Sequence, residues 1–242
     1  MSENLFISDL HLDSSRPGAT ATFLRFLQTD AQRADRLYIL GDLFEFWIGD
    51  DDDDPHSGEV LDGLRQYTAG GRRCLVMRGN RDFLLGARFE ARTGTHLLGD
   101  SPVDDIFGER VLIMHGDLLC TADHAYQRYR RLTSQPLLRR LFLGLPRAWR
   151  RAVVAEGRRR SRAHAATGDP GIMDVSPAAV VTAMARAGVN ILVHGHTHRP
   201  AIHHLEINGK PATRIVLGDW YEQGSVLHWS PSGFELRALP FA

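Results

Sequence analysis

The chain has few of the features that mark secreted or membrane-spanning proteins. Its 242 residues include only two cysteines, Cys74 and Cys120, which is too few for a disulfide framework. We interpret both as small buried hydrophobic residues of a protein in a reducing compartment. No segment approaches the roughly 20 apolar residues that a membrane span needs. We expect no cleaved signal peptide, because residues 1–10 lead directly into a strand that ends in metal-type donors.

Lysine is almost absent, and the positive charge is unevenly distributed. Lys210 is the only lysine, so arginine supplies nearly all the positive charge of a chain whose formal net charge is zero. Residues 121–166 contain twelve arginines against Asp123 and Glu156, a local balance of +10. A basic segment therefore lies beside an acidic remainder, and it requires an explanation of its own.

Short apolar runs alternate with helical patterns over the first hundred residues, which predicts a layered α/β fold with buried strands. The expected strands are 4–8, 36–40, 73–77, 103–107, 110–114 and 190–193, and the expected helices are about 18–33, 57–70, 83–92 and 177–187. Residues 121–166 are helical in pattern, with breaks at Pro136 and Pro146. The last strands, at about 201–207, 213–217, 224–229 and 233–238, have an antiparallel pattern.

Polar motifs follow most of these strands. They read Asp9-Leu10-His11, Gly41-Asp42, Gly79-Asn80-Arg81-Asp82, His115-Gly116-Asp117 and His194-Gly195-His196-Thr197-His198. Each motif alone is weak, since an Asp-x-His pair is more often a polar loop and a Gly-Asp pair a turn. Together they predict that strands of one sheet deliver metal ligands to one place. Carboxylate, imidazole and carboxamide donors suit Mn, Fe, Co or Zn, and the lack of thiolates argues against a structural zinc site.

The motifs resemble the signature of the calcineurin-like metallophosphoesterases, over residues 5–118 and 188–220. The resemblance implies one domain, residues 1–242, built as a four-layer αββα sandwich with a helical lid inserted at about 121–166. It also implies two metal ions, the first held by Asp9, His11, Asp42 and His198. The second is held by Asp42, Asn80, His115 and His196, so that Asp42 bridges the pair. His194 is expected to be a satisfied non-ligand.

Two cations about 3.5–4 Å apart lower the pKa of a bridging water and stabilise both oxygens of an in-line attack on phosphorus. The implied reaction is hydrolysis of a phosphate ester or anhydride by a metal-bridging hydroxide. Arg81 narrows this choice. Many members of the family have a histidine there to protonate an alkoxide, and an arginine does not supply that proton. An arginine does neutralise a departing phosphate, which favours cleavage of a pyrophosphate bond. The alternative is that Arg81 only pairs with Asp82.

The basic segment 121–166 is also rich in large apolar residues. They are Leu137, Leu138, Leu141, Phe142, Leu143, Leu145 and Trp149. This pattern suits a surface at an anionic membrane or a slot for acyl chains. Two alternatives remain for this segment: a cap packed on the core with solvated arginines, and a contact with nucleic acid. The acidic run Asp50–Asp54 is either a solvated loop or a loop at the rim of the metal site.

Longer segments resemble one subfamily more closely. They are Ser8–Leu12, Tyr38–Asp51, Gly79–Leu84, Met114–Leu118, Ile172–Val175, His194–Pro200 and Leu217–Trp220. These match the UDP-2,3-diacylglucosamine pyrophosphatases of lipid A synthesis over nearly the full chain. The resemblance implies hydrolysis of that lipid to UMP and 2,3-diacylglucosamine 1-phosphate. It also implies two Mn²⁺ ions and a monomer without nucleic acid, peripheral on the cytoplasmic face of the inner membrane of a Gram-negative bacterium.

The resemblance carries over residue roles as well. It makes Asp42, Asn80, Arg81 and His115 catalytic, and it makes Asn80, Arg81, Asp123, Tyr126, Ser161 and His196 contacts of the substrate. The chain departs from the subfamily at Ala165 and Gly168, where related sequences have polar residues, so the sugar contacts there differ. Two rival functions stay open: a nucleotide pyrophosphatase or phosphodiesterase of the same fold with a soluble substrate, and a non-enzymatic scaffold that retains the fold.

Overall fold

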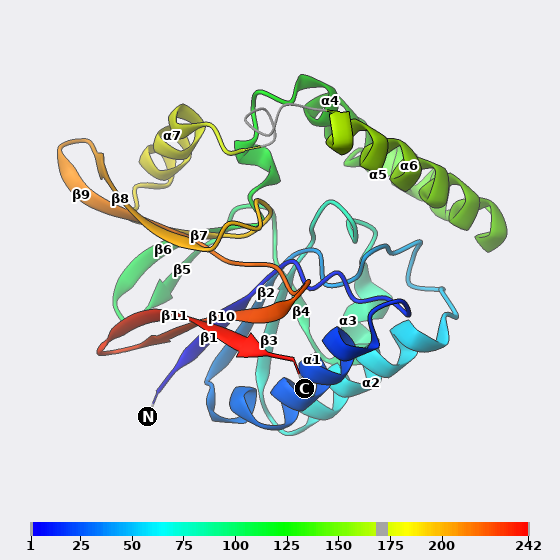
Figure 1. The fold of residues 1–242 in the computed structure, drawn as a ribbon, viewed down its shortest axis with the longest axis horizontal. Helices are drawn as coiled ribbons and strands as arrows, with labels where there is room; N and C mark the ends of the chain where they lie inside the picture. The colour runs from blue at the N-terminus through cyan, green and yellow to red at the C-terminus, as the bar shows by residue number, and fades with distance from the viewer. Residues whose placement is uncertain (1, 168–173, 242) are drawn as a thin grey trace.

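Two β-sheets lie face to face, with helices on the outer side of each (Figure 1). The computed structural model describes residues 2–167 and 174–241, without the side chains of residues 160–167. The mixed α/β architecture with two flanked sheets is the one that the sequence predicted. None of the helices in the described ranges is long and apolar enough to cross a bilayer.

The larger sheet has the strand order β11-β10-β1-β2-β3-β4. Its parallel centre consists of β1 (Asn4–Ile7), β2 (Arg36–Leu40), β3 (Arg73–Met77) and the short β4 (His96–Leu97). The hairpin of β10 (Gln223–Ser230) and β11 (Gly233–Pro240) joins it through an antiparallel pairing of β10 with β1. The parallel strands place their carboxyl ends at one edge of the sheet.

The smaller sheet has the order β5-β6-β7-β9-β8. Its strands are β5 (Val103–Ile106), β6 (Glu109–Met114), β7 (Ile191–His194), β8 (Ala201–Ile207) and β9 (Lys210–Val216). β6, β7 and β9 run parallel. The expectation that one sheet delivers all the polar motifs was therefore wrong, because β6 and β7 belong to this second sheet. The motifs meet because the two sheets face each other.

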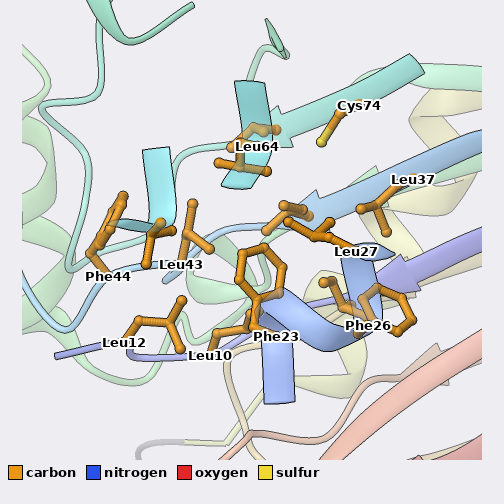
Figure 2. Close-up of a cluster of buried hydrophobic side chains, with 14 of the residues drawn as sticks. Leu10, Leu12, Phe23, Phe26, Leu27, Leu37, Leu43, Phe44, Leu64 and Cys74 are labelled. Atoms are coloured by element: carbon orange, nitrogen blue, oxygen red, sulfur yellow. The ribbon is translucent and has the colours of Figure 1, made fainter. Parts of the chain in front are cut away.

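Three apolar clusters fill the spaces between the layers. Side chains of β2 alternate between two of them: Leu37 and Ile39 face the helices, and Tyr38 and Leu40 face the other sheet. The first cluster packs α1 (Pro17–Gln28), α2 (Pro55–Ala69) and α3 (Ala87–Thr93) on the larger sheet. Figure 2 shows side chains of this cluster from α1, α2, β2 and β3. The third packs α7 (Pro177–Ala187) on the smaller sheet through Val180 and Met184. Cys74 and Cys120 are both buried in these clusters, as expected.

Three helices form a separate segment above one end of the sheets (Figure 1). They are α4 (His124–Thr133), α5 (Pro136–Leu143) and α6 (Arg147–Thr167), and we call them the helical insertion. Pro136 begins α5, and Pro146 immediately precedes α6, as the sequence indicated. In contrast, the expected helix at 18–33 is divided, since α1 ends at Gln28 and a 3₁₀ turn covers Asp30–Arg33.

The acidic run after β2 is not a freely solvated loop, because each of its five carboxylates has a partner. Asp54 caps α2 by accepting a hydrogen bond from Ser57 N (2.9 Å). Asp50 accepts four N–H groups: the indole of buried Trp47 (3.1 Å) and the backbone of Gly86, Arg88 and Phe89 at the start of α3 (3.0–3.1 Å). The charge of Asp50 also complements the positive end of α3. Asp51, Asp52 and Asp53 pair with arginines of the helical insertion.

Asp50→Ala should destabilise the fold by about 2–3 kcal/mol, because it leaves several buried N–H groups without an acceptor. Urea unfolding followed by tryptophan fluorescence measures this loss. Asp62→Ala is the control and should cost less than about 0.5 kcal/mol, since Asp62 on α2 forms, among the described residues, only surface ion pairs with Arg65 and Arg92. Equal stability of the two variants would contradict the capping role of Asp50.

Candidate metal centre

The seven candidate metal ligands follow strands of both sheets. Asp9 and His11 follow β1, Asp42 follows β2 and Asn80 follows β3. On the smaller sheet, His115 follows β6, whereas His196 and His198 follow β7. The structure thus brings together all seven residues that the sequence singled out, across 190 positions of the chain.

Five of these residues adopt left-handed backbone conformations. Their φ angles are 56° for Asp9, 50° for His11, 51° for Asp42, 72° for His196 and 56° for His198. Such conformations cost of order 1–3 kcal/mol each in a non-glycine residue and cluster at functional sites. Hydrogen bonds between the loops hold them, including His11 N to the Asp42 carbonyl (2.9 Å) and His196 N to Asp9 Oδ2 (2.8 Å).

Two glycines allow the loops to approach this closely. A Cβ on Gly79 would lie 2.1 Å from Asp42 Oδ1, and one on Gly195 would lie 2.3 Å from Asp9 Oδ2. Both contacts are far inside van der Waals range, so any side chain at either position would displace a candidate ligand. The glycines of the Gly-Asn and Gly-His motifs are thus explained by close packing against carboxylates.

One half of the centre contains Asp9, His11 and His198. His198 Nε2 lies 3.3 Å from both Asp9 Oδ1 and His11 Nε2. The buried Asp9 Oδ1 nevertheless accepts no aligned hydrogen bond from any described residue. A short separation between a carboxylate oxygen and an imidazole nitrogen, without hydrogen-bond alignment, is expected where both lone pairs point at a common ion.

The other half contains Asn80, His115 and His196. His115 Nε2 lies 3.0 Å from Asn80 Oδ1, and the rings of His115 and His196 are 5.0 Å apart between centroids. Asp42 lies between the halves, because its Oδ2 is 3.8 Å from His11 Nε2 and also 3.8 Å from His115 Nε2. That position suits a carboxylate shared by two cations.

The donor set fits divalent cations. The ligand atoms of Asp9, His11 and His198 all lie within 4.8 Å of one another, as do those of Asp9, Asp42 and His115. Carboxylate, imidazole and carboxamide ligands without thiolate suit Mn²⁺ and its neighbours in the first transition row. Asp9 Oδ1 lies 3.3 Å from His198 Nε2 but accepts no aligned hydrogen bond, so it is an oxygen that a bound cation would satisfy.

The protonation of the histidines leads to the same conclusion. Burial opposes a charge on His115, but the carboxylates of Asp42, Asp9 and Asp117 outweigh it and raise its pKa to about 9. For His198, burial is likewise outweighed by Asp219 and Asp9, which raise its pKa to about 10. Burial lowers the pKa of His196 to about 4. The carboxylates therefore attract positive charge, and a bound cation would replace these protons.

Three carboxylates around the ligands were not assigned a role from the sequence. Glu45 Oε2 lies 3.0 Å from His11 Nδ1, Asp219 Oδ2 lies 3.1 Å from His198 Nδ1, and buried Asp117 accepts from Tyr126 Oη (2.6 Å). Carboxylates behind ligating histidines fix the ring orientation and increase ligand basicity. Burial opposes ionisation of Glu45, but His11, Arg81 and Arg158 outweigh it and lower its pKa to about 2. All three lie within motifs noted above.

Arg81 is held at the centre by its backbone. Its N–H donates to Asp42 Oδ1 (2.8 Å), and its carbonyl accepts from Trp47 N (3.2 Å). In the described part of the chain its guanidinium forms no ion pair, and the alternative pairing with Asp82 does not occur. Asp82 is instead buried and accepts from Gly79 N (2.7 Å) and Leu43 N (2.8 Å).

The candidate substrate residues on the insertion lie beside the centre, as far as the structure describes them. Asp123 caps α4 by accepting from Tyr126 N (2.8 Å), and the Tyr126 ring is 6.2 Å from that of His196. Ser161, Ala165 and Gly168 fall outside the residues with described side chains. His194 is buried, with Nδ1 2.8 Å from the Gly195 carbonyl, and burial lowers its pKa to about 4.

The chain is similar to known proteins in sequence and in structure. The model of the calcineurin-like phosphoesterase family matches residues 5–200. A protein of Aeromonas hydrophila named UDP-2,3-diacylglucosamine hydrolase is 53% identical over 227 residues, 94% of each chain. A protein of the same name from Coxiella burnetii is 50% identical over 99% of this chain and 98% of its own. The crystal structure of a hypothetical protein from Pyrococcus horikoshii shares the fold, with 11% identity, a TM-score of 0.50 and coverage of 100% and 89%.

Asp42→Ala should lower turnover by about 1000-fold or more, because it removes the oxygens that lie between the two halves of the centre. Mn²⁺ binding measured by calorimetry should fall with it, while the circular dichroism spectrum is retained. Asp42→Asn, which keeps an oxygen for Arg81 N–H, separates loss of metal from loss of folding. Glu206→Ala, on exposed β8, is the control. An Asp42→Ala protein with normal manganese-dependent activity would refute the site.

Proposed function

The chain belongs to the calcineurin-like phosphoesterase family, and from that premise we propose that it hydrolyses the pyrophosphate bond of UDP-2,3-diacylglucosamine. The products are UMP and 2,3-diacylglucosamine 1-phosphate, and the reaction is a step of lipid A synthesis in a Gram-negative bacterium. The relatives of that name cover nearly the whole chain at about 50% identity, which supports the same substrate.

The family is hydrolytic and metal-dependent, and the candidate ligands fit two ions. We propose Mn²⁺, because oxygen and imidazole donors suit it. One ion would be held by Asp9, His11 and His198, and the other by Asn80, His115 and His196. Asp42 would contact both ions. When bound, such a pair supplies Lewis acidity and a water of lowered pKa for in-line attack at phosphorus.

The observation that carries the choice of a pyrophosphate is the guanidinium of Arg81, which forms no ion pair with any residue whose side chain is described. It follows the candidate ligand Asn80, and its backbone N–H is fixed on Asp42 at 2.8 Å. A guanidinium binds the phosphate that leaves but is not an acid that protonates an alkoxide. A sugar 1-phosphate is already an acceptable anion, and Arg81 neutralises the charge that it gains as the bond breaks.

We propose that further residues on the insertion side orient the lipid. Tyr126 lies between His196 and Asp117, whose carboxylate accepts its hydroxyl hydrogen bond, so its ring position is fixed. Asn80 and His196 are proposed to contact substrate as well as metal. Asp123 retains a second carboxylate oxygen beyond its cap to Tyr126 N. Holding the phosphate group in line with the attacking oxygen accounts for a large part of such a catalyst's effect.

The outward face of the insertion suits a lipid surface. Leu137, Leu141 and Trp149 are 69%, 62% and 67% exposed, which is unusual for residues of this size. Arginines accompany them on the same helices. We propose that these helices act as a lid over the acyl chains and rest on the anionic cytoplasmic face of the inner membrane.

The purified protein with Mn²⁺, detergent and the acylated UDP-sugar should release UMP. Unacylated UDP-N-acetylglucosamine should react at least about 100-fold more slowly in kcat/KM, because binding energy from the acyl chains is lost. Chromatography of the nucleotide products measures both reactions. Equal rates for both substrates would instead support a nucleotide pyrophosphatase that acts on soluble substrates, and no UMP from either would refute the proposal.

The double variant Leu141→Gln with Trp149→Gln should bind anionic phospholipid vesicles at least about 10-fold more weakly than the wild type, because two large apolar side chains no longer enter the membrane. Cosedimentation with vesicles measures the binding. Ile202→Gln is the matched control, since Ile202 is an exposed apolar residue on β8, away from the insertion. Unchanged binding by the double variant would exclude this face as the membrane contact.

A further inference from the structure

Glu45 contacts both the metal ligands and the helical insertion. It follows β2 in the Gly41–Trp47 loop and is only 8% exposed. Its Oε2 lies 3.0 Å from Nδ1 of His11, a close contact without hydrogen-bond alignment, while its Oε1 accepts a hydrogen bond from the guanidinium of Arg158. One buried carboxylate therefore joins a candidate metal ligand to α6, across 113 positions of the chain.

Arg158 is held in place by more than this ion pair. Its guanidinium lies over the ring of Phe46, 5.0 Å from the ring centroid, and its side chain is only 18% exposed. An arginine stacked on an aromatic ring and paired with a buried carboxylate has little freedom to reorient. The position of α6 and the position of the Glu45 carboxylate are thus fixed together.

The loop after β2 contacts the insertion at a second place. Arg150, which is 1% exposed, donates to the Ile48 carbonyl (2.7 Å) and to Asp51 Oδ1 (2.8 Å). Arg147 pairs with Asp53 at 2.6 Å and Arg151 with Asp52 at 2.7 Å. Residues 45–53 therefore contact the start of α6 through Asp51–Asp53 and His11 through Glu45.

From these contacts we propose that Glu45 is a positioning residue that couples the docking of the helical insertion to the orientation of His11. When the insertion is docked, Arg158 binds Oε1 of Glu45 and thereby holds Oε2 next to the imidazole of His11. This contact fixes the orientation of the His11 ring for metal binding. When the insertion moves away, the carboxylate loses its fixed partner and His11 loses its support. This inference rests on the proposed function only in taking His11 as a metal ligand.

The coupling has a thermodynamic consequence that a purely structural ion pair lacks. If docking of α6 raises the affinity for metal by some factor, then metal binding must favour docking by the same factor. Bound metal should therefore protect the amides of α6 from exchange, although no residue of α6 with a described side chain is a candidate ligand. The protection should require both Glu45 and Arg158.

Arg158→Gln should weaken Mn²⁺ binding by the full-length protein by about 10-fold, the effect typical of a lost partner behind a metal ligand. Isothermal titration calorimetry with Mn²⁺ alone measures this. Arg159→Gln is the matched control: Arg159 is the next residue of the same helix, is exposed, and among the described residues pairs only with Glu156 within α6. The control should bind Mn²⁺ as the wild type does.

Hydrogen exchange provides the second readout. In the wild type and in Arg159→Gln, saturating Mn²⁺ should slow exchange of the amides of residues 147–159. In Arg158→Gln and in Glu45→Gln it should not, even at Mn²⁺ concentrations that saturate the variant. The visible spectrum of the Co²⁺-substituted protein should also differ between Arg158→Gln and the control, because it reports the orientation of the ligands.

Wild-type Mn²⁺ affinity in Arg158→Gln, together with faster exchange in α6, would overturn the coupling and leave the pair a structural contact. Metal-dependent protection that persists in Arg158→Gln would overturn it as well. If Glu45→Gln fails to fold, Arg158→Gln alone decides the matter, since that residue lies on the insertion. None of these readouts uses a phosphate substrate, so they stand apart from the assay of UMP release.

Discussion

The structure depends on one electrostatic constraint: where the two sheets meet, lone pairs of buried carboxylate oxygens and imidazole nitrogens face one another. Asp9, Asp42 and four histidines point oxygen and nitrogen atoms at the same space, and Asp9 Oδ1 has no aligned donor. An arrangement of this kind is stable only with positive charge at its centre, as protons on the histidines or as cations. The left-handed backbone at five of the ligands is tolerated because hydrogen bonds between the loops fix it. The fold therefore supports the site at the expense of local strain.

The acidic loop after β2 links this centre to the rest of the molecule. Asp50 and Asp54 accept hydrogen bonds at the start of two helices of the core, Asp51–Asp53 pair with arginines of the insertion, and Glu45 contacts both His11 and Arg158. The basic insertion and the acidic remainder thus compensate each other across a defined interface. The basic and apolar residues of the insertion together indicated a lipid-binding surface. In the structure their surroundings differ: several of the arginines pair with the acidic loop, whereas Leu137, Leu141 and Trp149 remain exposed.

Much of the fold followed from local patterns in the sequence. β2, β3, α7 and β8 lie where apolar periodicity placed them, and Pro136 and Pro146 mark the helix boundaries of the insertion. The candidate ligands lie in motifs at strand ends, and their assignment to two ions was implied by the resemblance to the family. The assignment of all motifs to one sheet failed because strand pairing is non-local: nothing within residues 109–114 specifies that β6 pairs with β7 rather than with β3. The partners of Asp51–Asp53 and Glu45 were also inaccessible, because they lie about 100 residues away and depend on how the insertion docks.

The central claim is that seven side chains from two sheets bind a pair of divalent cations. Anomalous diffraction from crystals grown with Mn²⁺, collected on both sides of the manganese edge, tests it most directly. The account predicts two anomalous peaks, one in contact with Asp9, His11 and His198 and the other with Asn80, His115 and His196, and both in contact with Asp42. A single peak, or peaks that lie away from these residues, would contradict it.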